Sequence, residues 1–97
     1  MIAKFIVYKD SQGSEPTKTY ECRRLLFGVS KKALEIKNRM QKETEEEQIE
    51  SMIDFVQTIF PDFDRKDIAY VDVFELYAFL DTVINRTNND LHKTQKN

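Results

Sequence analysis

The stretch ETEEEQIESMIDFVQTIFPDF, residues 43–63, combines an acidic start, a stripe of large apolar residues and a proline stop. The glutamates at positions 45–47 favour a helix that begins here, because a helix N-terminus carries partial positive charge. Pro61 lacks an amide hydrogen and clashes with the preceding turn, so the helix should end at about Phe60. The apolar residues recur every three or four positions, which places them on one face. They are Ile49, Met52, Ile53, Val56, Ile59 and Phe60. The stretch therefore predicts an amphipathic helix that needs a packing partner.

The N-terminal part of the chain has the composition of two strands. Residues 4–8, KFIVY, are rich in β-branched and aromatic types, and residues 18–22, KTYEC, resume a strand-like alternation. The residues between them are polar and include Ser11, Gly13 and Ser14, which is typical of a turn-rich loop. We predict a β-hairpin with a loose loop. A lone hairpin is marginal in water, so one of its faces must pack on the helices.

A second helical stripe follows the hairpin. Its members are Leu26, Val29, Ala33, Ile36 and Met40. The stripe begins before Gly28 and Ser30. We therefore favour a helix from near Arg23 or Arg24 to about Lys42. In the competing interpretation Ser30 is the N-cap, because Gly28 inside a helix costs about 1 kcal/mol relative to alanine.

The C-terminal part carries a short helical turn and a last helix. Asp64, with Asp67 three residues later, resembles a helix start and predicts one short helical turn over residues 65–70. The last helix should run from about Asp72 to Arg86, with an apolar stripe formed by Val73, Leu76, Tyr77, Leu80, Val83 and Ile84. Residues 87–97 are mostly polar and should form a flexible tail. The predicted fold is α+β and mostly α: an N-terminal β-hairpin, three main helices and a short helical turn, in a single domain over residues 1–86.

Composition limits the classes of partner. The net charge is −2, so the chain has no general attraction to nucleic acid or to an anionic membrane. Cys22 is the only cysteine, which excludes an internal disulfide and fits a reducing cytosol. The first residues do not resemble a signal peptide, and no apolar run approaches membrane-spanning length. We expect a soluble cytosolic protein with no nucleic-acid or membrane partner.

The sequence offers little support for catalysis or metal binding. A calcium loop starting at Asp62 would need glycine at its sixth position and glutamate at its twelfth, where the chain has Asp67 and Val73. Helix capping explains the aspartates of this region better. His92, the only histidine, lies in the polar tail with no group nearby to orient it. Cys22 has no local histidine to act as its base. We expect no metal, no cofactor and no enzymatic activity.

Charges of opposite sign are separated along the chain. The basic set on the first predicted helix is Arg23, Arg24, Lys31, Lys32, Lys37, Arg39 and Lys42, and the acidic set at the start of the second is Glu43, Glu45, Glu46, Glu47 and Glu50. One interpretation is a basic face for nucleic acid. We favour the other, in which neighbouring antiparallel helices present opposite charges. The separated charges would also allow copies of the domain to stack head to tail.

Aromatic residues crowd the last two predicted helices and the turn between them. A small domain can bury only some of them, so the rest should form a patch suited to a protein partner. Phe55 and Phe79 fall off the main stripes, so we expect these two to be exposed. The predicted partner-binding residues are Phe55, Phe63, Tyr70, Phe74 and Phe79.

Several features follow one another in a recognisable order. The hairpin is followed by KALEI at residues 32–36, by EEEQIESMIDFV at residues 45–56, and by an F-x-x-F turn from Phe60 to Phe63. Asp67 and a final helix complete the series. Over roughly residues 4–86 this order resembles the small tail assembly chaperone family of long-tailed (siphovirus-type) bacteriophages and prophages of Gram-positive bacteria.

The resemblance implies a non-enzymatic role in building a phage tail. Such chaperones coat the tape-measure protein, keep its hydrophobic helices soluble and help to recruit tail-tube subunits. The resemblance also implies action in the host bacterial cytoplasm, absence from the mature virion and, as in many members, a longer form made by ribosomal frameshifting. Gln95-Lys96-Asn97 can be encoded as CAA-AAA-AAC, which contains a slippery run. The alternatives are a small structural phage protein of the head–tail joining region and a DNA-binding regulator that uses the basic first helix.

Overall fold

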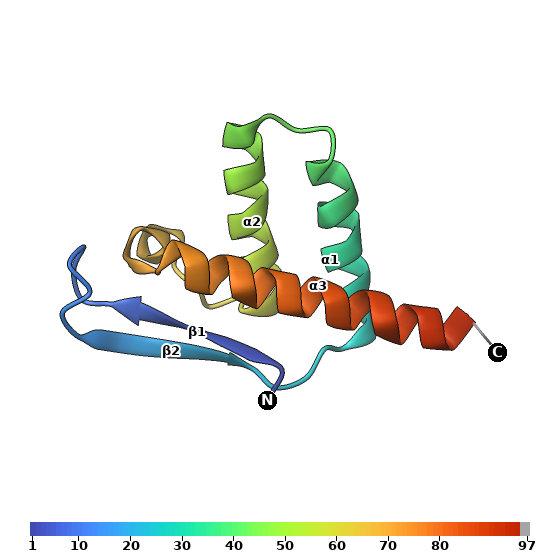
Figure 1. Ribbon diagram of the computed structural model, residues 1–97, viewed down its shortest axis with the longest axis horizontal. Coiled ribbons are helices and arrows are strands. Elements are labelled where there is room, and N and C mark those ends of the chain that lie inside the picture. Colours follow the sequence, from blue (N-terminus) through green and yellow to red (C-terminus); the bar gives the residue numbers. More distant parts are fainter. Residues whose placement is uncertain (96–97) are drawn as a thin grey trace.

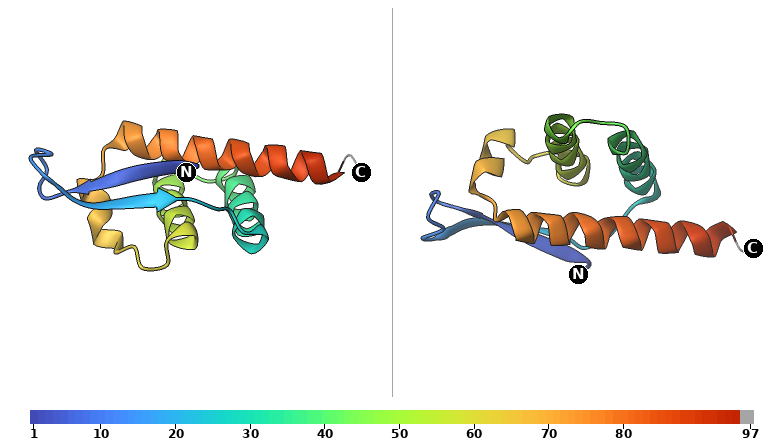
Figure 2. Two further views of the ribbon diagram at one scale, coloured as in Figure 1. Left: turned by 90° about the horizontal axis from the view of Figure 1, so that it is seen from below. Right: turned by 45° about the horizontal axis from the view of Figure 1, so that its top comes forward.

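The computed structural model describes the backbone of residues 1–95 and the side chains of residues 1–86. Its elements are β1 (Ala3–Tyr8), β2 (Pro16–Cys22), α1 (Phe27–Met40), α2 (Glu45–Ile59), the 3₁₀ turn η1 (Arg65–Tyr70) and α3 (Val73–Gln95). This order confirms the predicted α+β class with an N-terminal antiparallel hairpin. α1 and α2 form a helical hairpin, and α3 runs along the sheet and across the base of that hairpin (Figure 1). Figure 2 shows the same arrangement from two further sides.

The inward face of the sheet supplies part of the core. β1 and β2 pair in a register that places Phe5 opposite Tyr20. Because side chains alternate across a strand, Phe5 and Val7 of β1 point to the same face, and both are buried. Cys22 at the end of β2 is buried with them. The alternation in residues 4–8 and 18–22 therefore predicted the strands correctly.

The outer edge of β1 is closed by the segments around the start of α3. The backbone amide of Ile6 donates a hydrogen bond to the Glu75 carboxylate, and Val7 forms a β-bridge with Val71. These contacts satisfy an edge that would otherwise present unpaired backbone groups. They also fix the position of the first turn of α3 relative to the sheet.

α1 begins at Phe27, so Gly28 lies inside the helix as favoured, but the start predicted near Arg23 or Arg24 and the alternative N-cap at Ser30 are both wrong. A start near Arg23 or Arg24 is too early, because residues 23–26 have to carry the chain from β2 to the helices. Leu26 is still extended, with φ −71° and ψ 149°. Ser30 lies inside the helix and is buried rather than capping it. No side chain caps this start, and its first residues are exposed, so water can bond the amide groups that lack intrahelical partners.

Gly28→Ala is expected to stabilise the fold by about 0.5–1 kcal/mol. Gly28 has no left-handed φ, and an added Cβ would meet nothing within 4 Å, so alanine mainly lowers the entropy of the unfolded chain. Urea unfolding measures the change. Gly13→Ala is the matched control, because Gly13 has equally open surroundings but a φ of +69°, so alanine should destabilise there. A loss of stability for Gly28→Ala would contradict a helix that begins at Phe27.

α2 begins and ends where its sequence indicates. Thr44 and Glu47 form a capping box: the Thr44 hydroxyl accepts a hydrogen bond from the Glu47 amide, and the Glu47 carboxylate accepts one from the Thr44 amide. Hydrogen bonds from the Thr44 amide and then from its hydroxyl lower the pKa of Glu47. The helix ends at Ile59, and Phe60 is its C-cap, immediately before Pro61. The end predicted at about Phe60 is confirmed.

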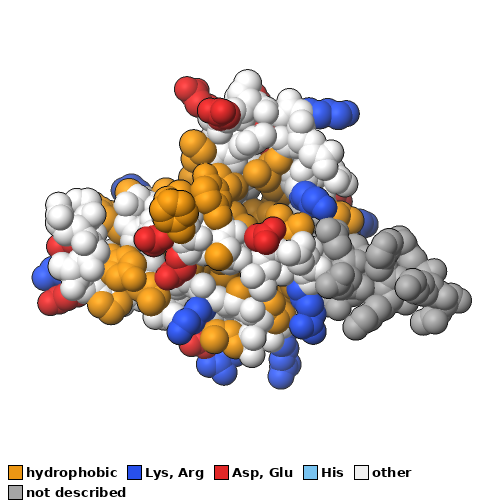
Figure 3. All heavy atoms as spheres, in the orientation of Figure 1, with side chains coloured by type: hydrophobic (Ala, Val, Ile, Leu, Met, Phe, Trp, Pro, Cys, Tyr) orange, Lys and Arg blue, Asp and Glu red, His pale blue; other side chains and the backbone are white. Residues whose placement is uncertain are grey.

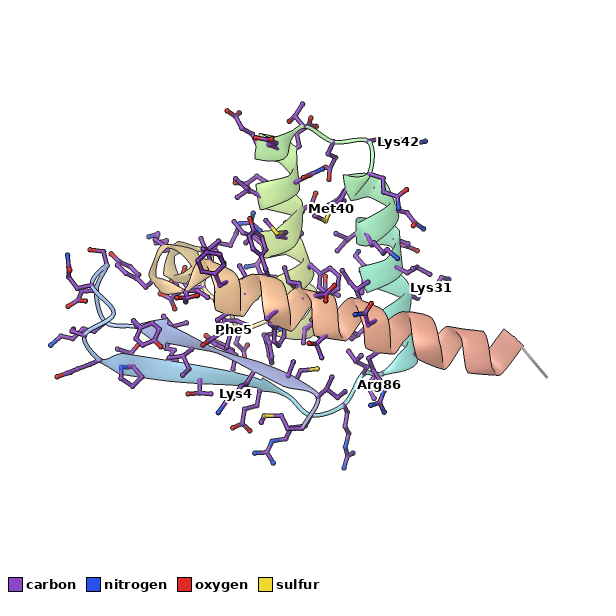
Figure 4. All side chains as sticks on the ribbon, viewed as in Figure 1. Lys4, Phe5, Lys31, Met40, Lys42 and Arg86 are labelled. Carbon is purple, nitrogen blue, oxygen red and sulfur yellow. The ribbon has the colours of Figure 1, made fainter. Side chains whose placement is uncertain are left out.

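Polar contacts tie α1, α2 and η1 together. Arg39 of α1 and Arg65 of η1 both reach the Asp54 carboxylate of α2, at 3.3 and 2.8 Å. Arg39, a member of the predicted basic set, thus pairs with α2, but its partner there is Asp54 rather than one of the predicted acidic residues. Lys31 and Lys42 differ, because their side chains point away from α2 (Figure 4). Much of the basic charge of α1 therefore faces outward.

The core centres on Phe5. Its ring stacks on Tyr20, with centroids 5.2 Å apart, and meets Phe79 edge-on at 5.0 Å. Phe60 and Phe63, on either side of the proline turn, both lie 5.8 Å from it. One aromatic cluster therefore joins the sheet, the end of α2 and the middle of α3, which makes their relative positions depend on the same side chains.

η1 and α3 both start at aspartate caps. The Asp64 carboxylate accepts from the Lys66 amide, and the Asp72 carboxylate accepts from the Glu75 amide, each at 2.9 Å. The capping interpretation of Asp64, the short turn over residues 65–70 and the predicted start of the last helix are confirmed. None of the helices in residues 1–95 combines the length and apolarity that crossing a bilayer requires.

The end of α3 differs from the prediction. The helix continues to Gln95, past the end expected near Arg86. Residues 87–95 contain neither glycine nor proline, so nothing in the backbone stops the helix, although the apolar stripe has ended. The predicted flexible tail includes residues 96–97 and the side chains of residues 87–95, which lie outside the described part.

Candidate protein-binding surface

A shallow apolar hollow lies where α3 crosses the helical hairpin. It has a volume of about 210 Å³, and α1, α2 and α3 all contribute to its wall. The lining residues are Met40, Met52, Phe55, Tyr77, Leu80, Asp81 and Ile84. Figure 4 shows Met40 directed into the space between α1 and α2. Asp81 is the only charged member of this lining.

Exposed apolar side chains continue from this hollow along two helices. On α3, Val73 and Phe74 lie one turn before Tyr77, and Phe74 is 79% exposed. On α2, Ile49 lies one turn before Met52 and is 52% exposed. We call these five residues the α2–α3 apolar surface. Figure 3 shows hydrophobic side chains gathered where α2 meets the start of α3.

The helical period explains why these side chains of α3 remain outside. The buried face of α3 consists of Leu76, Phe79, Leu80 and Val83. These positions are spaced by three and four residues, so they share one side of the helix. Phe74 and Tyr77 precede and interrupt that series, so their side chains point out of the core. The Asp72 cap fixes the residue at which α3 begins, and the contacts of Glu75 and Val71 with β1 hold its first turn against the sheet.

Three of the predicted partner-binding residues are buried in the core. Phe55, Phe63 and Phe79 are 1%, 2% and 2% exposed, so the expectation that Phe55 and Phe79 are exposed is wrong. The physical reason is that each helix has more than one packing neighbour. α2 lies beside α1 and η1, and α3 contacts both β1 and α1, so residues off the main stripe are covered as well.

The other two predicted residues reach the surface. Phe74 belongs to the α2–α3 apolar surface. Tyr70 is partly exposed and lines a second hollow of about 340 Å³, formed by η1 and the loop of the β-hairpin. The two hollows share no lining residue. The structure therefore does not bring the five predicted residues together.

The sequence contained a signal for the residues that the prediction missed. Ile49, Met52, Val73 and Tyr77 all belong to predicted apolar stripes, which we assigned to the core. Ile49 lies one turn after the start of α2, next to the acidic residues 45–47 at the tip of the helical hairpin. Where an apolar stripe extends beyond the element that its helix packs against, the stripe residues at that end of the helix remain exposed.

A different exposed apolar group lies beside arginines near the N-terminus. Met1, Leu26 and Phe27 are each more than two-thirds exposed. A third hollow, of about 390 Å³, is lined by Met1, Ile2, Arg23, Arg24, Leu25 and Arg86. We call Met1, Leu26 and Phe27, together with this hollow, the comparison surface. Arginines line its hollow, unlike that of the α2–α3 apolar surface.

Nucleophilic and metal-binding groups do not gather at any of these surfaces. Within the described residues, no three His, Cys, Asp or Glu side chains are placed to hold a metal ion. The side chain of His92, predicted to lack an orienting partner, lies outside the described part. Cys22 is buried, and its thiol contacts the Arg24 carbonyl oxygen at 3.6 Å. What the described surfaces offer is apolar area and charge.

Burial of Cys22 predicts a slowly reacting thiol. Desolvation raises the pKa of this thiol above its ordinary value, so the reactive thiolate is scarcer in the folded protein. We expect modification by iodoacetamide at neutral pH to be much slower for the folded chain than for the chain in urea, and to accelerate as the pH rises. Equal rates in the folded and unfolded states would contradict the position of Cys22 beneath the sheet.

Comparison with protein-family models, with curated proteins and with solved structures gave no match.

Proposed function

We propose that this chain is a non-enzymatic tail assembly chaperone of a long-tailed bacteriophage or prophage. In this proposal the α2–α3 apolar surface binds hydrophobic helical segments of the tape-measure protein, and the coated protein then receives tail-tube subunits. The work takes place in the host bacterial cytoplasm, and the chaperone is absent from the mature virion. The order of sequence elements that resembles this family is the starting point.

The observation that carries the proposal is the exposure of large apolar side chains around a shallow hollow. Phe74, Tyr77 and Ile49 are each at least half exposed, although the same chain buries Phe5, Phe55 and Phe79 almost completely. Leaving large apolar side chains in water has no structural benefit. Contiguous apolar patches of this kind mark surfaces that other proteins cover.

The shape of the surface suits a helical partner. Val73, Phe74 and Tyr77 follow the axis of α3, and Ile49 and Met52 follow the axis of α2, so the apolar side chains form two rows. The two rows cross, because α3 runs across the base of the helical hairpin (Figure 1). An amphipathic helix presents its own apolar row at spacings of three and four residues and can cover the hollow at this crossing together with the exposed side chains beside it. The aromatic cluster beneath holds α3 and the sheet in place, so the surface is preformed.

A coat of many copies also fits the physical properties of the domain. Each hollow is shallow, so each copy should bind and release readily. Many copies along one extended partner nevertheless bind strongly, because each bound copy raises the effective concentration of the neighbouring sites. The high proportion of charged residues, 33% of the chain, favours a coated complex that stays dissolved.

Co-expression with the tape-measure protein encoded in the same phage genome tests the proposal. We expect the wild-type chain to increase the soluble fraction of the tape-measure protein and to co-purify with it. The double variant Phe74→Ser/Tyr77→Ser should lose both effects while remaining folded, because both side chains are already in water. The matched control is Leu26→Ser/Phe27→Ser, which removes two large apolar side chains that are also at least half exposed from the comparison surface.

Two results would count against the proposal. If the tape-measure protein stays insoluble with the wild-type chain, the coating function fails. If the two double variants behave alike, the α2–α3 apolar surface is not the binding site. Mass spectrometry of purified virions addresses the alternative, because a structural protein of the head–tail joining region would persist there and a chaperone would not.

A further inference from the structure

The α2–α3 apolar surface lies between helices that carry acidic charge. α2 contains five Asp or Glu residues and no Lys or Arg, and residues 73–85 of α3 contain Glu75 and Asp81 and again no Lys or Arg. This is the reverse of α1, where Lys31 and Lys42 point outward on the far side from α2 (Figure 4). The side of the helical hairpin that carries the α2–α3 apolar surface is therefore acidic, whereas the outer side of α1 is basic.

Most of these carboxylates are already engaged within the fold. Glu50 and Asp54 form ion pairs with Arg65, with N–O distances of 2.6 and 2.8 Å. Glu47 belongs to the capping box of α2. Glu75 accepts a hydrogen bond from the backbone of β1. Their charge is neutralised or held by internal donors, so they offer little to a partner.

Three carboxylates remain for a partner. Glu45 and Glu46 have no ion-pair partner among residues 1–86, and they lie one turn before Ile49 on α2. Asp81 lines the hollow itself and has only a weak contact, 3.5 Å from the Asn85 amide. We call Glu45, Glu46 and Asp81 the acidic border. They stand at two ends of the apolar surface, next to the exposed tip of α2 and beside Tyr77.

The described residues that line the hollow include no lysine or arginine. Lys37 lies one turn before Met40 on α1 and is half-buried. Asp81 in the lining, with Glu45 and Glu46 one turn before Ile49 on α2, therefore gives the α2–α3 apolar surface an acidic border. Acidic charge around an apolar groove attracts a partner whose own apolar row is flanked by cations and repels one flanked by carboxylates.

We propose that the α2–α3 apolar surface selects amphipathic helices whose apolar row is flanked by lysine or arginine. This inference rests on the proposed function, because it specifies which helical segments of a partner the same surface accepts. The apolar side chains provide the affinity for a helix, and the acidic border provides the specificity for basic over acidic segments. The stretch of α3 from Val73 to Ile84 is about 18 Å long, so it matches a bound helix of roughly three turns.

Two designed peptides provide the test. Both are about 18 residues long and carry leucine at helical spacings of three and four, but one has lysine and the other glutamate at the remaining positions. The full chain should bind the leucine–lysine peptide about tenfold more tightly than the leucine–glutamate peptide at low salt, because several exposed ion pairs each contribute modestly. The preference should shrink as salt is added, because salt screens exposed charges.

Isosteric substitutions locate the source of the preference. Glu45→Gln/Glu46→Gln/Asp81→Asn should remove most of the preference for the lysine peptide. The matched control, Glu15→Gln/Glu35→Gln/Asp62→Asn, changes the net charge equally at exposed positions elsewhere and should retain it. Because Glu45 and Glu46 also favour the start of α2, thermal unfolding of each variant is measured, and Asp81→Asn alone provides a version that leaves this helix start intact.

The outcomes separate this inference from the proposed function. Equal binding of both peptides by the wild-type chain overturns the role of the acidic border and leaves a helix-binding surface. An equal loss of preference in the two triple variants also overturns it, because net charge alone would then be the cause. If neither peptide binds, both the inference and the helix-binding mode of the proposed function fail.

Discussion

Phe79→Ala is expected to lower the free energy of unfolding by about 3–5 kcal/mol, whereas Phe74→Ala changes it by no more than about 0.5 kcal/mol. The two phenylalanines lie on the same helix, but Phe79 is 2% exposed and meets Phe5 edge-on, while Phe74 is 79% exposed. Removing the buried ring leaves a cavity and ends an aromatic contact. Removing the exposed ring takes apolar area out of water and leaves the core unchanged.

Chemical denaturation of the wild-type chain, Phe79→Ala and Phe74→Ala under the same conditions measures both changes in the free energy of unfolding. The two variants remove the same atoms from the same helix, so helix propensity cancels and only the surroundings differ. Similar losses in both variants would contradict the rotation of α3 that places Phe79 inside and Phe74 outside. In that case the α2–α3 apolar surface would not exist as described.

Phe5→Ala is expected to have an effect of the same size, about 3–5 kcal/mol. Phe5 is fully buried and contacts Tyr20, Phe60, Phe63 and Phe79, so its removal affects the sheet, the end of α2 and α3 together. A domain of this size has a total stability of only about 5–15 kcal/mol, so the variant loses a large share of it. The melting temperature should fall by about 15 °C or more.

Lys4→Ala is the matched control for this prediction. Lys4 is the neighbour of Phe5 on β1, but it is exposed on the opposite face of the strand, so its loss should change stability by no more than about 0.5 kcal/mol. If Phe5→Ala proves too unstable to purify, Phe5→Leu keeps part of the volume and should cost about 1–1.5 kcal/mol. Near-equal stability of Phe5→Ala and Lys4→Ala would contradict the position of Phe5 at the centre of the core.

Elements marked by local signals could be predicted from the sequence. The strands follow from alternation, α2 from its acidic first turn and Pro61, and η1 from the Asp64 cap, because each signal acts within a few residues of the feature it controls. The start of α1 could not be predicted in this way. It depends on how many residues the chain needs to cross from β2 to the helices, which is a distance set by the whole fold.

The candidate site was harder to predict because exposure depends on packing neighbours. A single stripe marks one buried face, but α2 has several neighbours, so Phe55 is buried away from its stripe. On α3 the buried face is rotated relative to the predicted stripe, so Phe79 lies on it and Tyr77 does not. Conversely, Ile49 and Tyr77 belong to stripes but lie outside the contact areas, so they remain exposed. Which end of a stripe is covered depends on where α3 crosses the helical hairpin, and no local pattern encodes that crossing.

Methyl NMR of the methionines would test the central claim most directly. The chain has three methionines: Met40 and Met52 line the hollow of the candidate surface, and Met1 lines the comparison surface. With methyl-labelled protein, adding a soluble peptide that spans one hydrophobic helical segment of the tape-measure protein should shift or broaden the signals of Met40 and Met52 and leave that of Met1 unchanged. A change confined to Met1, or no change in any of the three signals, would contradict binding at the α2–α3 apolar surface.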